Sequence, residues 1–199
     1  MEIEAKDSFL ESVKTYLNRH RWYNRLYDYI RYDIPNFFRN VWLFRKALRE
    51  YYWWDSHGTL LFMKTSFEHM ATKFDKHGHE IESSRNKKVM KMCRAVELLE
   101  NYLEDKYIEL AEKELGEIKY HPLEFEPAKD HPGYYTMVDR RTAEEQDHER
   151  KVFELSRTLE ESQWNELLEI LKGQDYSKFS KKKDWDEQFD GSGIRGWWD

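Results

Sequence analysis

Apolar residues that recur every three or four positions are the feature that most limits how this chain can fold. One such series follows Pro35 and consists of Phe37, Val41, Phe44, Leu48 and Tyr51. Similar series occupy residues 60–74, 83–115 and 142–173. Side chains at this spacing share one face of an α-helix. Only 8 glycines and 4 prolines occur among the 199 residues, which excludes a turn-rich all-β fold.

Residues that favour helix ends divide these series into five or six helices. Ser8 and Thr142 each begin a capping box, whose side chains satisfy free amide groups at a helix start. Residues 22–32 also have helical spacing, and Pro35 suits the first position of a helix that we expect to run to about Trp54. A break is expected near residues 101–105. The other expected boundaries are Asp55 or Ser56 and Ser83 or Ser84 as starts, and Gly78, Gly116 and Gly173 as ends.

Two segments depart from the helical pattern. Residues 117–141 hold three of the four prolines, which predicts a long loop or a small β-hairpin. Residues 174–199 are first lysine-rich and then aromatic, so we expect this tail to dock on the body or on a partner. The predicted fold is mainly α: a single helical-bundle-like domain over residues 1–173, with an irregular Pro-containing insertion at 117–141 and an aromatic C-terminal tail.

Composition indicates a packed protein outside the membrane. Charged residues make up 36% of the chain, but 16% is aromatic, and disordered chains are poor in aromatic residues. Cys93 is the only cysteine, which excludes an internal disulfide, and its apolar surroundings predict a buried side chain. The N-terminus resembles no signal peptide, and no apolar run approaches the ~20 residues that span a bilayer. We expect a soluble, cytoplasmic protein with no membrane partner.

Charge is distributed unevenly along the chain. Residues 17–52 contain eight basic and three acidic residues, a balance of +5, whereas residues 97–174 contain ten basic and 21 acidic residues, a balance of −11. The whole chain carries −6. This overall charge is unfavourable for duplex nucleic acid, which we do not expect as a partner.

The basic charge in the N-terminal part comes from arginine interleaved with aromatic residues. Guanidinium groups bind phosphates in pairs of hydrogen bonds, and they stack on aromatic rings that can also stack on nucleotide bases. The alternative is that these arginines pair with the acidic half of the chain. The predicted ligand-binding residues are Arg19, Arg21, Trp22, Tyr23, Arg25, Arg45, Arg49, Trp53 and Trp54.

Motifs of common enzymes are missing from the sequence. It contains no GxxxxGK[ST], GxSxG, CxxC or HExxH, and Gly191-Ser192-Gly193 follows no apolar strand, which predicts a flexible turn. One enzyme alternative remains, a Mg²⁺-dependent all-α nucleotide pyrophosphohydrolase. Its candidate metal-binding residues are Glu97, Glu100, Glu104, Glu145 and Glu149. Their spacing departs from the EExxE pattern of that family, so we expect neither a metal nor a cofactor.

Several strings resemble a group of uncharacterised helical proteins of tailed bacteriophages. They are Asn40-Val41-Trp42-Leu43-Phe44-Arg45-Lys46-Ala47-Leu48, Tyr52-Trp53-Trp54-Asp55, Ser84-Arg85-Asn86-Lys87-Lys88, Ala111-Glu112-Lys113-Glu114-Leu115-Gly116 and Arg195-Gly196-Trp197-Trp198-Asp199. The similarity covers residues 36–116 and the last segment. The resemblance implies a virus-encoded protein that acts in a bacterial host, and it implies no activity.

Two binding functions follow from these observations. The first is a non-enzymatic protein that captures a phosphate-bearing, nucleotide-like ligand and so blunts a host defence. The second is a virion or assembly component, or a protein that binds a host protein, with tryptophan and arginine as interface anchors. The tail residues predicted to contact such a partner are Trp185, Phe189, Arg195, Trp197 and Trp198. A homo-oligomer is also compatible with the sequence.

Overall fold

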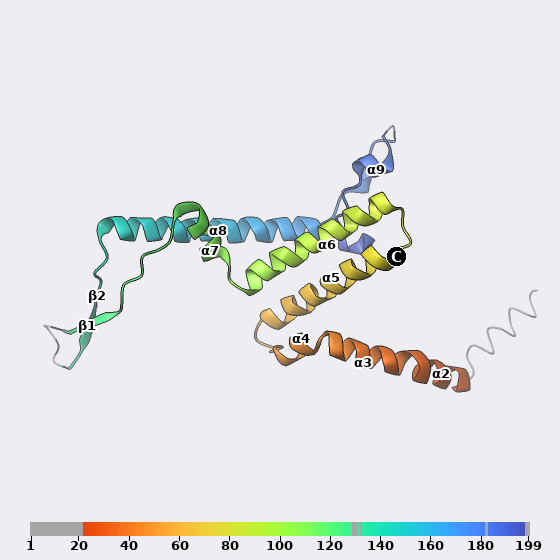
Figure 1. Ribbon diagram of the computed structural model, residues 1–199, viewed down its shortest axis with the longest axis horizontal. Coiled ribbons are helices and arrows are strands. Elements are labelled where there is room, and N and C mark those ends of the chain that lie inside the picture. The colour runs from red at the N-terminus through yellow and green to blue at the C-terminus, as the bar shows by residue number, and fades with distance from the viewer. Residues whose placement is uncertain (1–21, 129–130, 132, 182, 198–199) are drawn as a thin grey trace, which may run out of the picture. The chain divides into compact units, whose positions relative to one another are not determined.

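The structure, a computed structural model, describes residues 22–128, 131, 133–181 and 183–197 (Figure 1). The helix predicted to start at Ser8 and the predicted site residues Arg19, Arg21 and Trp198 lie outside these residues. The chain divides into two compact units, residues 1–62 and 63–199. The described residues of the C-terminal tail, which we expected to dock on the body or on a partner, lie in the second unit. The prediction of a mainly α chain is confirmed.

The first unit contains a helical stretch that runs without interruption from Trp22 to Leu43. It consists of α2 (Trp22–Asp28), a π-turn (Tyr29–Asp33) and α3 (Ile34–Leu43). Pro35 was expected to start a separate helix, but the π-turn joins α2 to α3 through a hydrogen bond from the Ile34 N–H to the Tyr29 carbonyl. Proline lacks an amide hydrogen and clashes with the carbonyl one turn before it, and the wider π-turn accommodates both defects.

The helix after Pro35 ends earlier than predicted. Phe44 leaves the helical conformation, with φ −91° and ψ 9°, and only the short α4 (Arg45–Arg49) follows it. The expected continuation to Trp54 is wrong, because residues 50–56 form an irregular turn. The aromatic ring of Phe62 anchors this region, 5.3 Å from the Phe44 ring and 6.3 Å from the Tyr51 ring.

The next two helices begin and end close to the predicted positions. The Asp55 carboxylate accepts a 2.9 Å hydrogen bond from the His57 N–H at the start of α5 (His57–His77), and Gly78 follows its last residue. Helix α6 (Glu82–Leu103) starts within two residues of the expected serines. The predicted break lies at residues 104–106, where Asp105 has φ 49°, and α7 (Tyr107–Leu115) then ends at Gly116 with φ 102°.

The proline-containing insertion forms the small hairpin that was one of its two predicted structures. Strand β1 (Glu124–Pro127) pairs antiparallel with β2 (Tyr135–Val138), with Phe125 opposite Met137. Helix α8 (Ala143–Lys172) follows. The Thr142 hydroxyl accepts from the Glu145 N–H, and the Glu145 carboxylate accepts from the Thr142 N–H, so the predicted capping box is confirmed. With its 30 residues α8 is about 45 Å long.

The core of the second unit joins α5, α6, α7 and α8. Its most buried apolar side chains include Phe67, Met92, Leu98, Leu99, Val152, Leu167 and Ile170. Ala111, Ile118 and Val152 form a further buried cluster between α7 and α8. Cys93, predicted to be buried, is exposed instead. The core-facing positions of α6 at that level are Met92 and Ala95, and Cys93 lies outside their stripe.

The described residues between 174 and 197 complete this core. They contain a 3₁₀ turn (Tyr176–Lys178), α9 (Trp185–Gln188) and a second 3₁₀ turn (Ile194–Gly196). The Gly193 N–H donates a 2.8 Å hydrogen bond to the Ile170 carbonyl of α8. Gly191 has φ 85°, and a Cβ atom there would overlap the backbone of Lys87 on α6. The expected flexible turn at 191–193 is therefore a buried turn, where glycine permits two backbones to approach each other.

Candidate interaction surface

The first unit presents a long face of exposed aromatic residues. On α3 the apolar residues Ile34, Phe37, Phe38, Val41 and Trp42 share one face, while Asn36, Arg39 and Asn40 lie opposite. Trp42 is 68% exposed and Trp22 on α2 is 75% exposed. We call residues 22–43 the arm, and its apolar side the arm face. Within the described part of the first unit nothing covers this face.

The π-turn keeps the arm face continuous. The apolar series of α2 passes through Trp22, Leu26 and Tyr29, and an unbroken α-helix would continue it at residues 33, 36 and 40. The apolar residues of α3 instead lie one position later in the sequence, at Ile34, Phe37 and Val41. A π-turn takes up one residue more than an α-turn, so it offsets this shift. The two apolar series therefore lie on the same side of the arm.

The described arginines of the first unit form no ion pair with the described carboxylates of that unit. No carboxylate in its described part lies within 4.0 Å of the guanidinium groups of Arg25, Arg31, Arg39, Arg45 and Arg49, each of which is exposed. Instead they contact neutral groups of the same stretch. Arg45 lies 4.2 Å above the Trp42 ring and donates to the Trp42 carbonyl at 2.7 Å. Arg31 donates to the Tyr27 hydroxyl at 2.8 Å.

The predicted ligand-binding residues do not converge on one hollow. Trp22, Tyr23 and Arg25 lie on α2, at the opposite end of the arm from Arg45, Arg49 and the tryptophan pair. The helical rise places the two groups about 30 Å apart along the arm. Trp53 is 83% exposed, its ring meets that of Trp54 edge-on at 5.5 Å, and Trp54 in turn stacks on Tyr52 at 5.0 Å. The structure thus places these residues along an extended surface.

Two of the five predicted partner-binding residues of the tail, Phe189 and Trp197, are buried in the structure. Trp197 is 4% exposed, donates its indole N–H to the Gly191 carbonyl at 2.8 Å and meets the Phe67 ring at 5.2 Å. Phe189 is 6% exposed and stacks on Trp185. Of the predicted residues that the structure describes, Trp185 and Arg195 are exposed. Trp197 and Phe189 are buried within the second unit and therefore inaccessible to a partner, which corrects the expectation for these two residues.

The glutamates of the hydrolase alternative are each paired with a cation of the second unit. Lys106 binds both Glu100, at 2.9 Å, and Glu104, at 2.8 Å, and the hydrogen bond from Lys106 is the main cause that lowers the pKa of Glu100. Arg94 pairs with Glu97 at 2.8 Å. Because these cations are in place, none of Glu97, Glu100 and Glu104 offers a free carboxylate to a metal ion.

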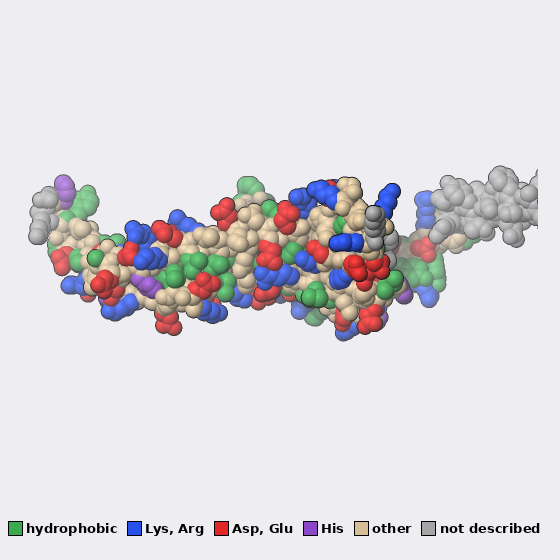
Figure 2. All heavy atoms as spheres, turned by 90° about the horizontal axis from the view of Figure 1, so that it is seen from above, with side chains coloured by type: hydrophobic (Ala, Val, Ile, Leu, Met, Phe, Trp, Pro, Cys, Tyr) green, Lys and Arg blue, Asp and Glu red, His purple; other side chains and the backbone are tan. Residues whose placement is uncertain are grey.

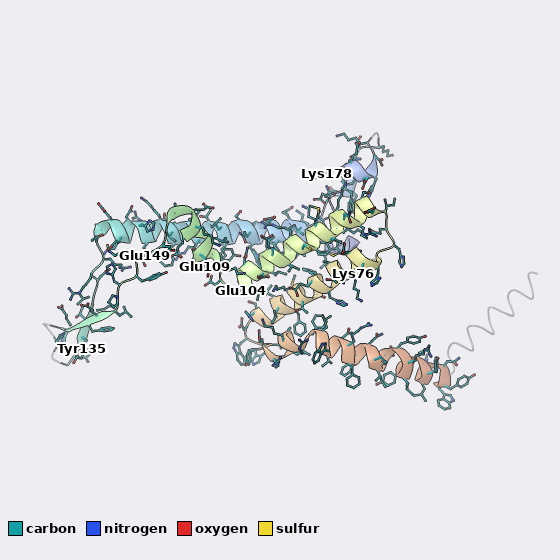
Figure 3. The ribbon with its side chains drawn as sticks, in the orientation of Figure 1. Lys76, Glu104, Glu109, Tyr135, Glu149 and Lys178 are labelled. Carbon is teal, nitrogen blue, oxygen red and sulfur yellow. The ribbon has the colours of Figure 1, made fainter. Side chains whose placement is uncertain are left out.

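The second glutamate pair lies elsewhere along α8. Glu145 accepts from Lys119 at 2.7 Å, and this bond, together with the Thr142 N–H, lowers the pKa of Glu145 to about 2. Glu149 pairs with Arg141. Figure 3 shows Glu149 and Glu104 on separate parts of the unit. Helix α6 meets α8 at Gln163, about 20 Å further along α8 than Glu149. In the described residues no three His, Cys, Asp or Glu side chains gather to hold a metal ion.

A hollow of about 620 Å³ lies where the tail meets α6 and α8 in the second unit. Its charged groups are paired: Lys91 with Asp190 at 3.5 Å, and Lys172 with Glu169 at 3.3 Å. Lys178 pairs likewise with Asp175 at 3.6 Å. Figure 2 shows acidic and basic side chains intermixed over the face of the protein that it presents. This hollow therefore offers less unbalanced charge for a ligand than the arm does.

Sequence reasoning missed most of the arm face. Phe37 and Val41 were recognised as a stripe, but a stripe alone does not distinguish a core from an exposed face. The sequence did contain a signal of exposure, namely Arg25, Arg31 and Arg39 with few carboxylates between them. A helix that faces a core usually pairs its cations with its own acidic neighbours.

A second exposed apolar group was also missed. On the hairpin, Phe125, Tyr135 and Met137 lie on one face, as their register shows, and all three are exposed. In the sequence these apolar residues alternate with the polar residues Glu124, Glu126 and Thr136, a pattern that indicates strands with one apolar face.

Comparisons of this chain with models of protein families, with curated proteins and with solved structures give no match. Among the described helices, none combines the length and the apolar composition needed to cross a membrane.

Proposed function

We propose that this chain is a non-enzymatic interaction protein that binds a macromolecular partner through the arm face. The observation that carries the proposal is the exposure of eleven large apolar side chains on residues 22–42. They are Trp22, Tyr23, Leu26, Tyr27, Tyr29, Ile30, Tyr32, Phe37, Phe38, Val41 and Trp42. Such a surface is costly in water unless a partner covers it in the working state.

The area of the arm face supports a macromolecular partner. An aromatic side chain offers ~150–250 Å² when fully exposed, so at the observed exposures these eleven side chains present on the order of 1,000 Å². The largest apolar patch of a typical monomer is about 300–600 Å², and one side of a standard protein interface covers about 800 Å². The arm face therefore matches a protein interface in size.

The arginines give this surface the composition of an interface. Arginine and tryptophan are the residues that most often dominate binding energy, and Arg45 on Trp42 combines both. From residue 22 to residue 49 there are six basic and two acidic residues, a balance of +4. A partner with acidic groups beside an apolar patch fits this surface. A virion component or a host protein of that kind would suit the resemblance to phage proteins.

The test is site-specific photo-cross-linking in a cell that contains the partner. A photo-reactive phenylalanine analogue replaces Phe38 in one variant and Met90 in another, because Met90 is also exposed but lies on α6. We expect a discrete cross-linked product with the Phe38 variant and none with the Met90 variant. Equal products from both sites, or none from Phe38 and from a third variant at Trp42, would refute the proposal.

A second candidate function is the capture of a phosphate-bearing ligand at the Arg45 end of the arm. Two features favour this candidate: the guanidinium of Arg45, which has no carboxylate partner in the described first unit, and the exposed rings of Trp53 and Trp54. Guanidinium groups bind phosphates, and aromatic rings stack on bases. Calorimetry with a panel of nucleotides and cyclic nucleotides is the test, with Arg45→Ala as the matched variant. Folded protein that gives no heat with any of them removes this candidate.

A further inference from the structure

The arm face covers a wide part of the helix circumference. Successive residues of an α-helix point about 100° apart, so Phe37 and Trp42, five residues apart on α3, mark two edges about 140° from each other. Ile34, Phe38 and Val41 point between these edges. The seam that two helices share in a coiled coil is narrower. A partner that covers the whole arm face must therefore curve around the helix.

The edge of the arm face at Tyr27 and Trp42 is basic. Arg31 donates to the Tyr27 hydroxyl at 2.8 Å, and Arg45 lies 4.2 Å above the Trp42 ring. Arg39 follows Arg31 at a distance of one π-turn and one α-turn, so both arginines share this edge. None of these three arginines has a carboxylate within 4.0 Å in the described part of the first unit.

The opposite edge has a different balance of charge. Arg25 points about 160° away from Tyr27 on α2. It lines an open hollow of about 780 Å³ together with Asp28 and Asp33. The charge along the arm face is therefore one-sided, with three arginines at one edge, and one arginine with two aspartates at the other.

We infer that the partner is a protein with an apolar groove that takes up the arm along its length. One wall of this groove, the acidic wall, carries carboxylates and lies against Arg31, Arg39 and Arg45. The inference rests on the proposed function and names the shape and the charge of its partner. A groove that binds an amphipathic helix needs apolar contacts along one helix face and complementary charge at its rim. The arm offers both over about 30 Å of helix.

A protein wall fits the basic edge better than an anionic lipid surface does. Both edges of a helix that lies in a bilayer surface meet the same headgroups, so Asp28 and Asp33 would be repelled there. Pro35, between Arg31 and Arg39, has no N–H, so a carbonyl one turn before it lacks its usual donor within the arm. A protein wall can donate a hydrogen bond to this carbonyl, whereas acyl chains cannot.

Cross-linking from both edges of the arm face tests the groove. The photo-reactive phenylalanine analogue replaces Phe37, Phe38 or Trp42 in the full chain. We expect all three variants to join the same protein, with Phe37 and Trp42 joined to different segments and the Trp42 segment rich in Asp and Glu. Asn36, on the opposite side of α3, is the control and should give no product. A product from Phe38 and only one edge, or a Trp42 segment without acidic residues, would overturn the inference.

Charge reversal tests the acidic wall. Arg31→Glu and Arg39→Glu should each lower the yield of the Phe38 product roughly tenfold at low chain concentration, because attraction becomes repulsion. Arg25→Glu makes the same change in charge at the opposite edge and is the matched control, with a loss below roughly threefold. Glutamate is a good helix former, so circular dichroism should show the same helix content in all variants. Equal losses from all three substitutions would mean general attraction without an acidic wall and would overturn the inference.

The outcomes also separate this inference from the proposed function. A Phe38 product with twice the mass of the chain would identify a second copy, which overturns the inference while the proposed function stands. A product from a flat partner surface has the same consequence. If neither Phe38 nor Trp42 gives a protein product, and the chain instead sediments with vesicles of phosphatidylcholine and phosphatidylserine, both proposals fail.

Discussion

Replacing Trp197 with alanine should destabilise the second unit strongly, although this residue lies in the segment that the sequence marked as a tail. The indole is 4% exposed, packs edge-on against Phe67 and donates a 2.8 Å hydrogen bond to the Gly191 carbonyl. Loss of a buried tryptophan costs ~3–5 kcal/mol, and the orphaned carbonyl adds to that cost. For a unit of this size the melting temperature should fall by roughly 10–20 °C.

Urea unfolding followed by circular dichroism is the suitable assay, because it does not depend on the fluorescence of the altered residue. Trp53→Ala is the matched control: Trp53 is 83% exposed, and its replacement should change the free energy of unfolding by at most ~0.5 kcal/mol. Trp197→Phe should keep much of the packing and lose the hydrogen bond, with a cost of ~1–2 kcal/mol. If Trp197→Ala costs less than ~1 kcal/mol, the segment does not pack on α5 and α8, and the reasoning is wrong.

Three further predictions concern the second unit. Gly191→Ala should lower its stability by ~1–3 kcal/mol in urea unfolding, because the positive φ and the nearby α6 backbone both exclude a Cβ atom. The pKa of Glu145 is lowered to about 2 by Lys119, so its contribution to stability should persist at neutral pH and disappear as the pH falls from about 4.5 towards 2; other carboxylates titrate in the same range, so melting curves of Glu145→Gln should show a smaller loss than those of the wild type, and the difference reports Glu145. Arg94 binds Glu166 with two hydrogen bonds of 2.8 and 2.7 Å but is partly exposed, so Arg94→Ala should cost only ~0.5–1 kcal/mol, and a cost above ~2 kcal/mol would contradict the solvent screening assumed here.

Local chemistry explains which parts of the fold the sequence predicted. The capping box at Thr142 and the glycines at residues 116 and 173 fix helix ends through contacts of a few neighbouring residues. Such contacts are visible in a sequence because they depend on spacing alone. The same is true of the break near residue 105 and of residues 117–141, where three prolines indicated a long loop or a small β-hairpin.

Features that depend on distant contacts were predicted less well. The continuity of α2 and α3 through Pro35 depends on a π-turn, which leaves no pattern of its own in the sequence. The role of Trp197 depends on Phe67 and on α8, so its aromatic character was correctly noticed while its burial was not. The two ends of the arm carry similar residues, and only the length of the helix between them shows that these residues cannot surround one small ligand.

The contact between Trp197 and Phe67 also affects how the protein is made. Phe67 leaves the ribosome long before Trp197, so the core of the second unit stays open during most of translation. A product truncated before α9 would expose the ring of Phe67 on α5, which Trp197 covers. We therefore expect proteases to remove such fragments quickly, so that only chains translated through this segment accumulate in the cell.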